Sequence, residues 1–138
     1  MKKTEASVEY AGNGYYVAVT PSGHAQVLDS NGARSDASGP LELLLVALGG
    51  CTAFDVMSIL DKKRQTVTGY RVEVRGDRRE EHPRSFRRIE VRHIVTGHAV
   101  SPEAVARAVS LSTEKYCSVA ATLRPTAEIV STFEIIEG

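Results

Sequence analysis

The sequence predicts one compact domain that combines helices with short antiparallel strands. Three observations predict it: short β-favouring segments separated by turn signals near the N-terminus, a long apolar helical stretch from Leu41, and two strictly alternating segments after it. A chain of 138 residues, 42% of them hydrophobic, can bury a core but rarely forms more than one domain. We therefore expect a single domain over residues 1–138.

The first segments are expected to form a small antiparallel meander. Residues 5–30 alternate strand-favouring pieces, among them YYVAVT and HAQVLD, with the turn signals Gly12-Asn13-Gly14, Pro21-Ser22-Gly23 and Asn31-Gly32. The following stretch, GARSDASGP, is polar and rich in Gly, Ser and Pro, which indicates a loop.

A helix is predicted from Leu41 to about Arg64. Ser38 is a candidate cap near Pro40, and the basic end suits the negative pole of the helix dipole. Seven of the eight residues Leu41–Leu48 are apolar. Because no amphipathic stripe remains there, this half of the helix should be buried on all sides.

Alternation over Tyr70–Arg75 and over Arg88–Val95 predicts two strands with one solvent-facing side, joined by a polar connection. The β-branched run Ala127–Ile136 predicts a closing strand.

A second helix is predicted to open at Ser101-Pro102-Glu103, with a hydroxyl cap, a proline in the first turn and an acid near the positive pole. Cys117 lies at or just past its end. One face of this helix carries Val105, Ala108, Val109, Ser112 and Tyr116.

Composition argues against several classes of partner. Seventeen basic and seventeen acidic residues balance, so no net charge draws the chain to nucleic acid or to an anionic membrane. The eight arginines between Arg71 and Arg92 are offset by five acids and predict a solvated face. With neither a secretory signal nor eighteen uninterrupted apolar residues, we expect a soluble, cytoplasmic protein.

Two cysteines in a reducing compartment indicate buried thiols, a ligand pair or a redox pair. Cys51 follows Gly49-Gly50, and glycines inside a helix, which cost about 1 kcal/mol each relative to alanine, are tolerated where the backbone bends or is closely approached. A bend there would give Cys51 the positive pole of a new helix, which favours the thiolate.

Other interpretations of these residues stay open. Cys51 is otherwise a small hydrophobe in a crowded helix, and Cys117 a core residue after a helix. A metal site that adds His93 or His98 is weakly indicated, since no CxxC or HxH pair occurs.

Three segments together resemble the OsmC/Ohr family of peroxide-reducing proteins, in its OsmC-like branch: GPLELLLVALGGCTAFDVMSILDKKRQ, YRVEVRGDRREEHPRSFRRIEV and LSTEKYCSVAATL. The resemblance runs from about His24 to the C-terminus. It implies an α+β fold in which antiparallel sheets wrap around a long central helix. It also implies an intertwined homodimer with sites where the subunits meet, so that a partner subunit would cover the apolar helix.

The resemblance further implies a thiol-dependent hydroperoxide reductase, with Cys51 as the peroxidatic and Cys117 as the resolving cysteine. An external dithiol would reduce the resulting disulfide, and no metal, flavin or haem would be required. We expect organic hydroperoxides as substrates because the pocket walls would be apolar. These walls are Leu44, Leu48, Phe54 and Tyr116.

In the Ohr branch, a glutamate at the start of the central helix pairs with an arginine that lies against the reactive thiol. Glu42 is the candidate glutamate, one position out of register, and Arg34, the only arginine upstream of Cys51, is the candidate cation. Arg34 is otherwise an ordinary solvated side chain. The alternative function is a non-catalytic thiol redox sensor or small-molecule binding protein of the same fold.

Overall fold

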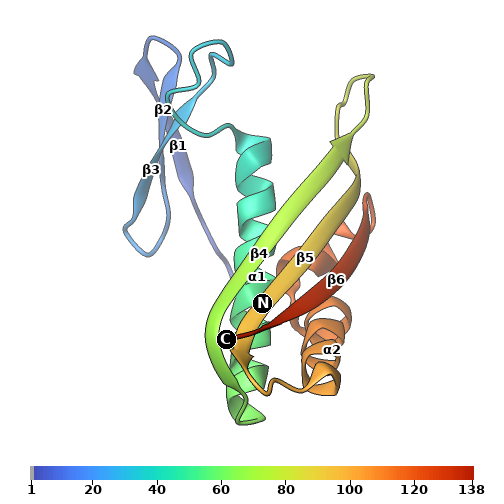
Figure 1. Ribbon diagram of the computed structural model, residues 1–138. Helices are drawn as coiled ribbons and strands as arrows, with labels where there is room; N and C mark the ends of the chain where they lie inside the picture. The colour runs from blue at the N-terminus through green and yellow to red at the C-terminus, as the bar shows by residue number, and fades with distance from the viewer. Residues whose placement is uncertain (1) are drawn as a thin grey trace. The chain divides into compact units, whose positions relative to one another are not determined.

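The computed structural model describes residues 2–138, which form strands and helices in the predicted order (Figure 1). Contacts divide the chain into two compact units, one extending to Leu44 and one covering Leu45–Gly138. The elements are β1 (Ser7–Gly12), β2 (Tyr15–Val19), β3 (Ala25–Asp29), α1 (Pro40–Lys62), β4 (Thr66–Arg78), β5 (Phe86–His98), α2 (Pro102–Leu111), a π-helical turn η1 (Ser112–Tyr116), α3 (Ser118–Leu123) and β6 (Glu128–Glu137).

The first unit contains the predicted meander. Strands β1, β2 and β3 pair in that order, and both pairings are antiparallel. The β1–β2 turn places Gly12, Asn13 and Gly14 at positive φ, the left-handed region that Gly and Asn tolerate best. The meander is therefore confirmed.

Helix α1 begins at Pro40, one residue before the predicted start, and its cap differs from the predicted Ser38. The carbonyl of Gly39 accepts the first helical hydrogen bond, from Leu43 N–H at 3.2 Å, and Glu42 Oε1 accepts from Gly39 N–H at 2.8 Å. This is the glutamate half of a capping box, with Pro40 at the first helical position. Gly39 rather than Ser38 is thus the cap residue.

The expected bend at Gly49-Gly50 is absent, because α1 is one continuous helix through the described residues Pro40–Lys62. A Cβ on Gly49 would lie 3.0 Å from Val74 Cγ2, whereas a Cβ on Gly50 would meet nothing within 4 Å. Gly49 therefore permits the close approach of β4 to the helix. Cys51 lies in the middle of α1 and does not gain a new helix pole.

One side of α1 is left open by the single chain, contrary to the predicted burial on all sides. Val46 is 67% exposed and Phe54 is 80% exposed. An 18-residue window of α1 has a mean hydropathy of 2.0, so by length and composition alone the helix would also suit a membrane span. Buried core helices of soluble proteins meet the same criterion.

The second unit is built on the sheet β4-β5-β6, shown in front of α1 and α2 in Figure 1. Strands β4 and β5 are antiparallel, but β5 and β6 are parallel. The expectation of antiparallel sheets is therefore wrong for this pair. The reason is the connection, since α2, η1 and α3 form the long crossover that a parallel pair requires.

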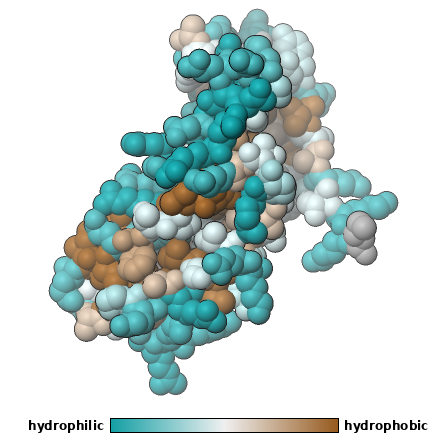
Figure 2. Space-filling model, turned by 90° about the vertical axis from the view of Figure 1, so that its right-hand side faces the viewer, coloured by the Kyte–Doolittle hydropathy of each residue, from teal (hydrophilic) through white to brown (hydrophobic). Residues whose placement is uncertain are grey.

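The main core of the second unit lies between α1, β5 and α2. Its buried members are Val56, Leu60, Val95, Val100, Ala104, Val105, Ala108 and Val109. The opposite side of β5 carries Arg88 and Arg92, which pair with Glu128 and Glu134 of β6 at 3.0 and 2.6 Å. The solvated arginine face is thus confirmed. In the view of Figure 2, hydrophilic surface surrounds a few hydrophobic patches.

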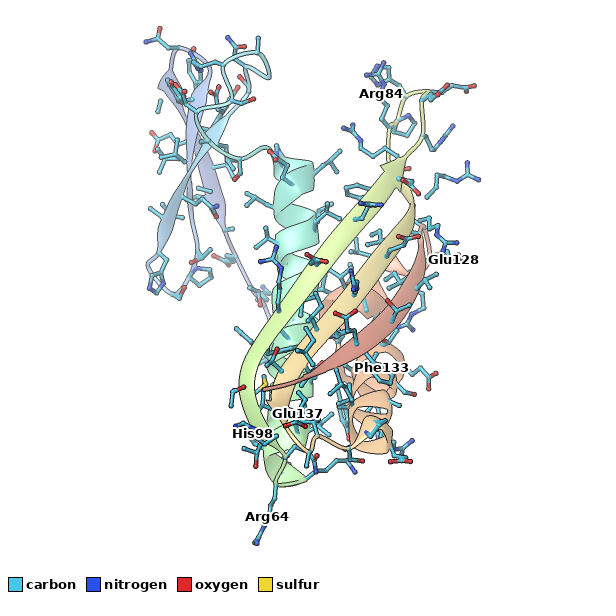
Figure 3. The ribbon with its side chains drawn as sticks, in the orientation of Figure 1. Arg64, Arg84, His98, Glu128, Phe133 and Glu137 are labelled. Carbon is cyan, nitrogen blue, oxygen red and sulfur yellow. The ribbon has the colours of Figure 1, made fainter. Side chains whose placement is uncertain are left out.

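Charged side chains also mark the ends of these elements (Figure 3). Arg64 lies just beyond α1 and points away from the fold, and Arg84 lies at the tip of the β4–β5 connection. His98 and Glu137 lie together where β5 and β6 end, with Nδ1 and Oε2 3.4 Å apart.

The second helix has the predicted start and a different end. Ser101 Oγ accepts from Ala104 N–H at 3.2 Å, which confirms the cap. After Leu111 the chain continues as the π-helical turn η1, and Cys117 N–H donates to the carbonyl of Ser112 at 2.8 Å. Tyr116, expected on the inner helix face, is 51% exposed because the wider turn changes the register.

Candidate functional site

The two cysteines, far apart in the sequence, come together in the second unit. Cys51 lies on α1 and is partly buried, while Cys117 follows η1 and is 2% exposed. The pKa of the Cys117 thiol is raised to about 11, mainly by burial and further by the neighbouring Cys51 thiol, against a lowering by the Ala120 N–H. The two free thiols therefore lie near each other.

The π-helical turn sets the position of Cys117. Its i→i+5 hydrogen bond places Cys117 one wide turn above Ser112. Cys117 also has extended backbone angles and caps α3, where its Sγ accepts from Ala120 N–H at 3.4 Å. The thiol is thus held by secondary structure on both sides.

A chain of hydrogen bonds lies beside the thiols. Ser112 Oγ donates to Asp55 Oδ2 at 2.8 Å, and Thr52 Oγ1 lies 2.8 Å from Ser112 Oγ. Since the single hydroxyl proton of Ser112 goes to Asp55, Thr52 must be the donor to Ser112. Thr52 and Ser112 are both buried. The chain therefore ends on the carboxylate of Asp55, one helical turn after Cys51.

Asp55 also borders a cleft of about 550 Å³. The walls combine one carboxylate and two lysines with apolar side chains. They are Asp55, Ser58, Ile59, Lys62, Lys63, Leu111 and Tyr116. Of the apolar walls expected from the sequence, only Tyr116 lines this cleft. The negative charge of Asp55 contributes to the raised pKa of Cys117.

A second polar pair joins β4 and β5 of the same unit. Tyr70 Oη lies 2.7 Å from His93 Nδ1, and His93 is fully buried. Among residues 2–138, His93 Nε2 has no hydrogen-bond partner. Burial lowers the pKa of His93 to about 4, and burial, followed by the charge of Asp55, raises the pKa of Tyr70.

The other two candidate residues belong to the first unit, where each has its own partners. Glu42 caps α1 through Gly39. Arg34 is not an ordinary solvated side chain: its Nε and Nη2 donate to the two carboxylate oxygens of Asp29 at 2.9 and 2.6 Å, and its guanidinium lies 4.0 Å from the Tyr15 ring centroid. Their role at the thiol stays a prediction.

Asp55 and Ser112 are not among the site residues predicted from the sequence. Asp55 follows Cys51 by four residues, so the two share one face of α1, and a carboxylate in so apolar a helix is a signal that could have indicated it. Ser112 could not be singled out, because a π-helical turn has no clear sequence pattern. Within residues 2–138, no three His, Cys, Asp or Glu side chains are grouped to hold a metal.

The fold and the paired thiols define the class of protein to which the chain belongs. The OsmC-like protein family matches residues 32–132, and the chain is a member of that family.

Individual relatives agree with this assignment. Protein YhfA of Escherichia coli strain K12 is 42% identical over 132 residues, which are 96% of this chain and 98% of YhfA. A hypothetical protein from Aquifex aeolicus VF5 has a crystal structure that is 33% identical, with a TM-score of 0.89 over 100% of this chain and 99% of the other.

A more distant structure carries a functional name. It is an organic hydroperoxide resistance protein from Legionella pneumophila, which is 14% identical with a TM-score of 0.71 over 97% of this chain and 98% of the other. At this identity, the likeness establishes a shared fold.

Proposed function

We propose that the protein is a thiol-dependent hydroperoxide reductase in which Cys51 reacts with the peroxide and Cys117 resolves the product. The position of the two thiols near each other carries this proposal. Membership of the OsmC-like family supports it, as does the fold shared with an organic hydroperoxide resistance protein. Cys51 is the more accessible thiol, which suits it to meet the substrate first.

The proposed cycle has three balanced steps. The Cys51 thiolate attacks the terminal peroxide oxygen, the O–O bond breaks, and the alkoxide leaves as an alcohol after taking up a proton. Cys51 is then a sulfenic acid, which condenses with the Cys117 thiol to a disulfide and water. An external dithiol reduces that disulfide and is itself oxidised, which suits the reducing conditions of the cytoplasm.

Replacing each cysteine separately tests the assignment. Cys51→Ser is expected to abolish peroxide consumption, because the nucleophile is lost. Cys117→Ser is expected to consume one equivalent of peroxide and then to stop at the sulfenic acid or oxidise further. Mass spectrometry after one equivalent of an organic hydroperoxide reads both outcomes. A wild-type protein that forms no Cys51–Cys117 disulfide would contradict the two-cysteine cycle.

We also propose that the protein works as a homodimer. Val46 and Phe54 leave an apolar side of α1 exposed, and an apolar groove of about 320 Å³ runs beside it between α1 and β4. An obligate interface of more than about 2,000 Å² would cover such a surface. We expect sedimentation at twice the chain mass in buffer without detergent, and a lower mass for Phe54→Asp. A folded wild-type monomer at micromolar concentration would contradict the proposal.

A specific observation supports a second candidate, a thiol sensor without turnover. The Cys117 pKa is raised, and the nearby charged group that contributes to it is a carboxylate rather than a cation. Such a pair would resolve slowly and signal through its oxidation state. Several turnovers in the presence of a dithiol would exclude the sensor, whereas one equivalent consumed would favour it.

A further inference from the structure

The resolving step poses a chemical difficulty at Cys117. A thiol attacks sulfur as its thiolate, so Cys117 must lose a proton as the disulfide forms. Burial raises the pKa of Cys117, so its neutral thiol predominates at pH 7. A nearby base would therefore speed resolution at neutral pH.

Asp55 is placed to be that base. Cys51 and Asp55 lie one turn apart on one face of α1, whereas Ser112 begins η1 and Cys117 follows its end. The two thiols lie near each other, and a hydrogen bond joins Ser112 Oγ to Asp55 Oδ2 at 2.8 Å. The two thiols and the Asp55 carboxylate thus lie about one helical turn apart, where α1 meets η1.

The hydrogen bonds leave Asp55 one oxygen for proton transfer. Oδ2 is held by Ser112, which Thr52 holds in turn. Within residues 2–138, Oδ1 accepts no hydrogen bond, and the carboxylate borders the cleft. A base acts at hydrogen-bonding distance or through one water, and the cleft beside Asp55 has room for such a water.

We propose that Asp55 is the proton-transferring residue of the thiol pair: it takes the proton of Cys117 as the Cys51–Cys117 disulfide forms. The peroxide step of the proposed function supplies the natural electrophile, the Cys51 sulfenic acid, and in that respect the inference rests on the proposed function. As the S–S bond forms and the S–O bond breaks, the proton moves from Cys117 to Asp55. It then moves to the departing hydroxide, which leaves as water.

Other titratable groups face the same region and must be separated from Asp55 in any pH profile. They are Tyr70 on β4, Lys62 and Lys63 at the outer cleft wall, and the two thiols themselves. Tyr70 has a raised pKa, so it stays neutral across the range of interest.

The test uses an electrophile that does not depend on peroxide activity. Methyl methanethiosulfonate converts the more accessible Cys51 to a methyl disulfide, and Cys117 then displaces methanethiol to form the same internal disulfide. Acid quenching and mass spectrometry follow this second step, and peptide mapping verifies that the adduct lies on Cys51. We expect Asp55→Asn, which still accepts from Ser112, to slow the step about 100-fold at pH 7.

Two controls separate proton transfer from a general effect on the fold. Asp61→Asn makes the same change at an exposed position of α1 and should leave the rate unchanged. Asp55→Ala opens space at the cleft, and formate should restore its rate while leaving the wild type unaffected. The Asp55→Asn rate should rise about tenfold per pH unit through neutral pH, because only the thiolate would then attack, whereas the wild-type rate should depend weakly on pH.

The sign of the effect decides the inference. If Asp55 acted only as a negative charge beside Cys117, its removal would favour the thiolate and speed the step. An Asp55→Asn rate equal to or above the wild-type rate would therefore overturn the inference, as would a wild-type adduct that never resolves. Absence of peroxide consumption by a protein that passes this test would overturn only the proposed function.

Discussion

The two units of the chain handle buried polar groups in opposite ways. In the first unit, the buried carboxylate of Asp29 is matched by the two-pronged guanidinium of Arg34, and Asp36 N–H donates to it at 3.0 Å. In the second unit, the buried His93 pairs with the partly buried Tyr70. The first unit thus buries a paired charge, whereas the second buries a histidine that must stay uncharged.

Because of this difference, the two units should lose stability in different ranges of acidic pH. Arg34 lowers the pKa of Asp29 well below its usual value, so the ion pair persists until the solution is strongly acidic. Burial lowers the pKa of His93 to about 4, so the folded state resists a protonation that the unfolded chain accepts near pH 6.5. Moderate acid should therefore affect the second unit alone.

The largest expected effect is the loss of stability through His93. Its stabilising contribution is complete above pH 6.5 and is lost as the pH falls through about 4, since the unfolded state binds the proton first. The loss should amount to about 3 kcal/mol in the free energy of unfolding. Urea unfolding of the wild type and of His93→Gln at pH 7, 5.5 and 4 measures it, because His93→Gln should lose this dependence on pH.

The comparison between the units supplies the controls. His98→Gln changes an exposed histidine and should keep the wild-type slope. Hydrogen exchange by peptide should show faster exchange in β4 and β5 at pH 4.5 and little change in β1–β3, because the Asp29 contribution is lost only below about pH 3.8. If hydrogen exchange became equally faster in both sheets, the proposed difference in acid sensitivity between the two units would be wrong.

Much of the fold could be predicted because its signals are local. Alternation placed β4 and β5, and the Ser101-Pro102-Glu103 signal placed the start of α2. The parallel pairing of β5 with β6 could not be predicted, since register and direction depend on contacts between distant segments. The continuity of α1 was missed because a glycine pair permits either a bend or a close approach, and only the position of Val74 decides between them.

In the candidate site, too, local features could be predicted from the sequence, and features that depend on distant contacts could not. The motifs around Cys51 and Cys117 predicted the family, which the comparisons confirm, and the structure brings the two thiols together. The hydrogen bonds that link Thr52, Ser112 and Asp55 could not be predicted from the sequence, because they depend on a π-helical turn that aligns residues five apart. Polar groups that act across elements are visible only once those elements are packed.

The capping role of Glu42 predicts a smaller effect, confined to the helix start. Glu42→Ala should lower the free energy of unfolding by about 1 kcal/mol, because Gly39 N–H loses its acceptor. Glu42→Gln keeps an acceptor oxygen and should cost only a few tenths of a kcal/mol through the lost charge at the positive helix pole. Thermal unfolding of the two variants measures the difference.

The same pair of variants tests whether Glu42 orients a cation toward Cys51. Nine residues of a continuous α-helix separate them, which at about 100° per residue places their side chains on opposite sides of α1. A capping role therefore leaves the alkylation rate of Cys51 unchanged in Glu42→Gln. A cation-orienting role predicts slower alkylation in Glu42→Gln and likewise in Arg34→Ala. Since Arg34 is already bound by Asp29, only slower alkylation in both variants would assign them to the thiol, and unchanged rates would confine them to the architecture of the first unit.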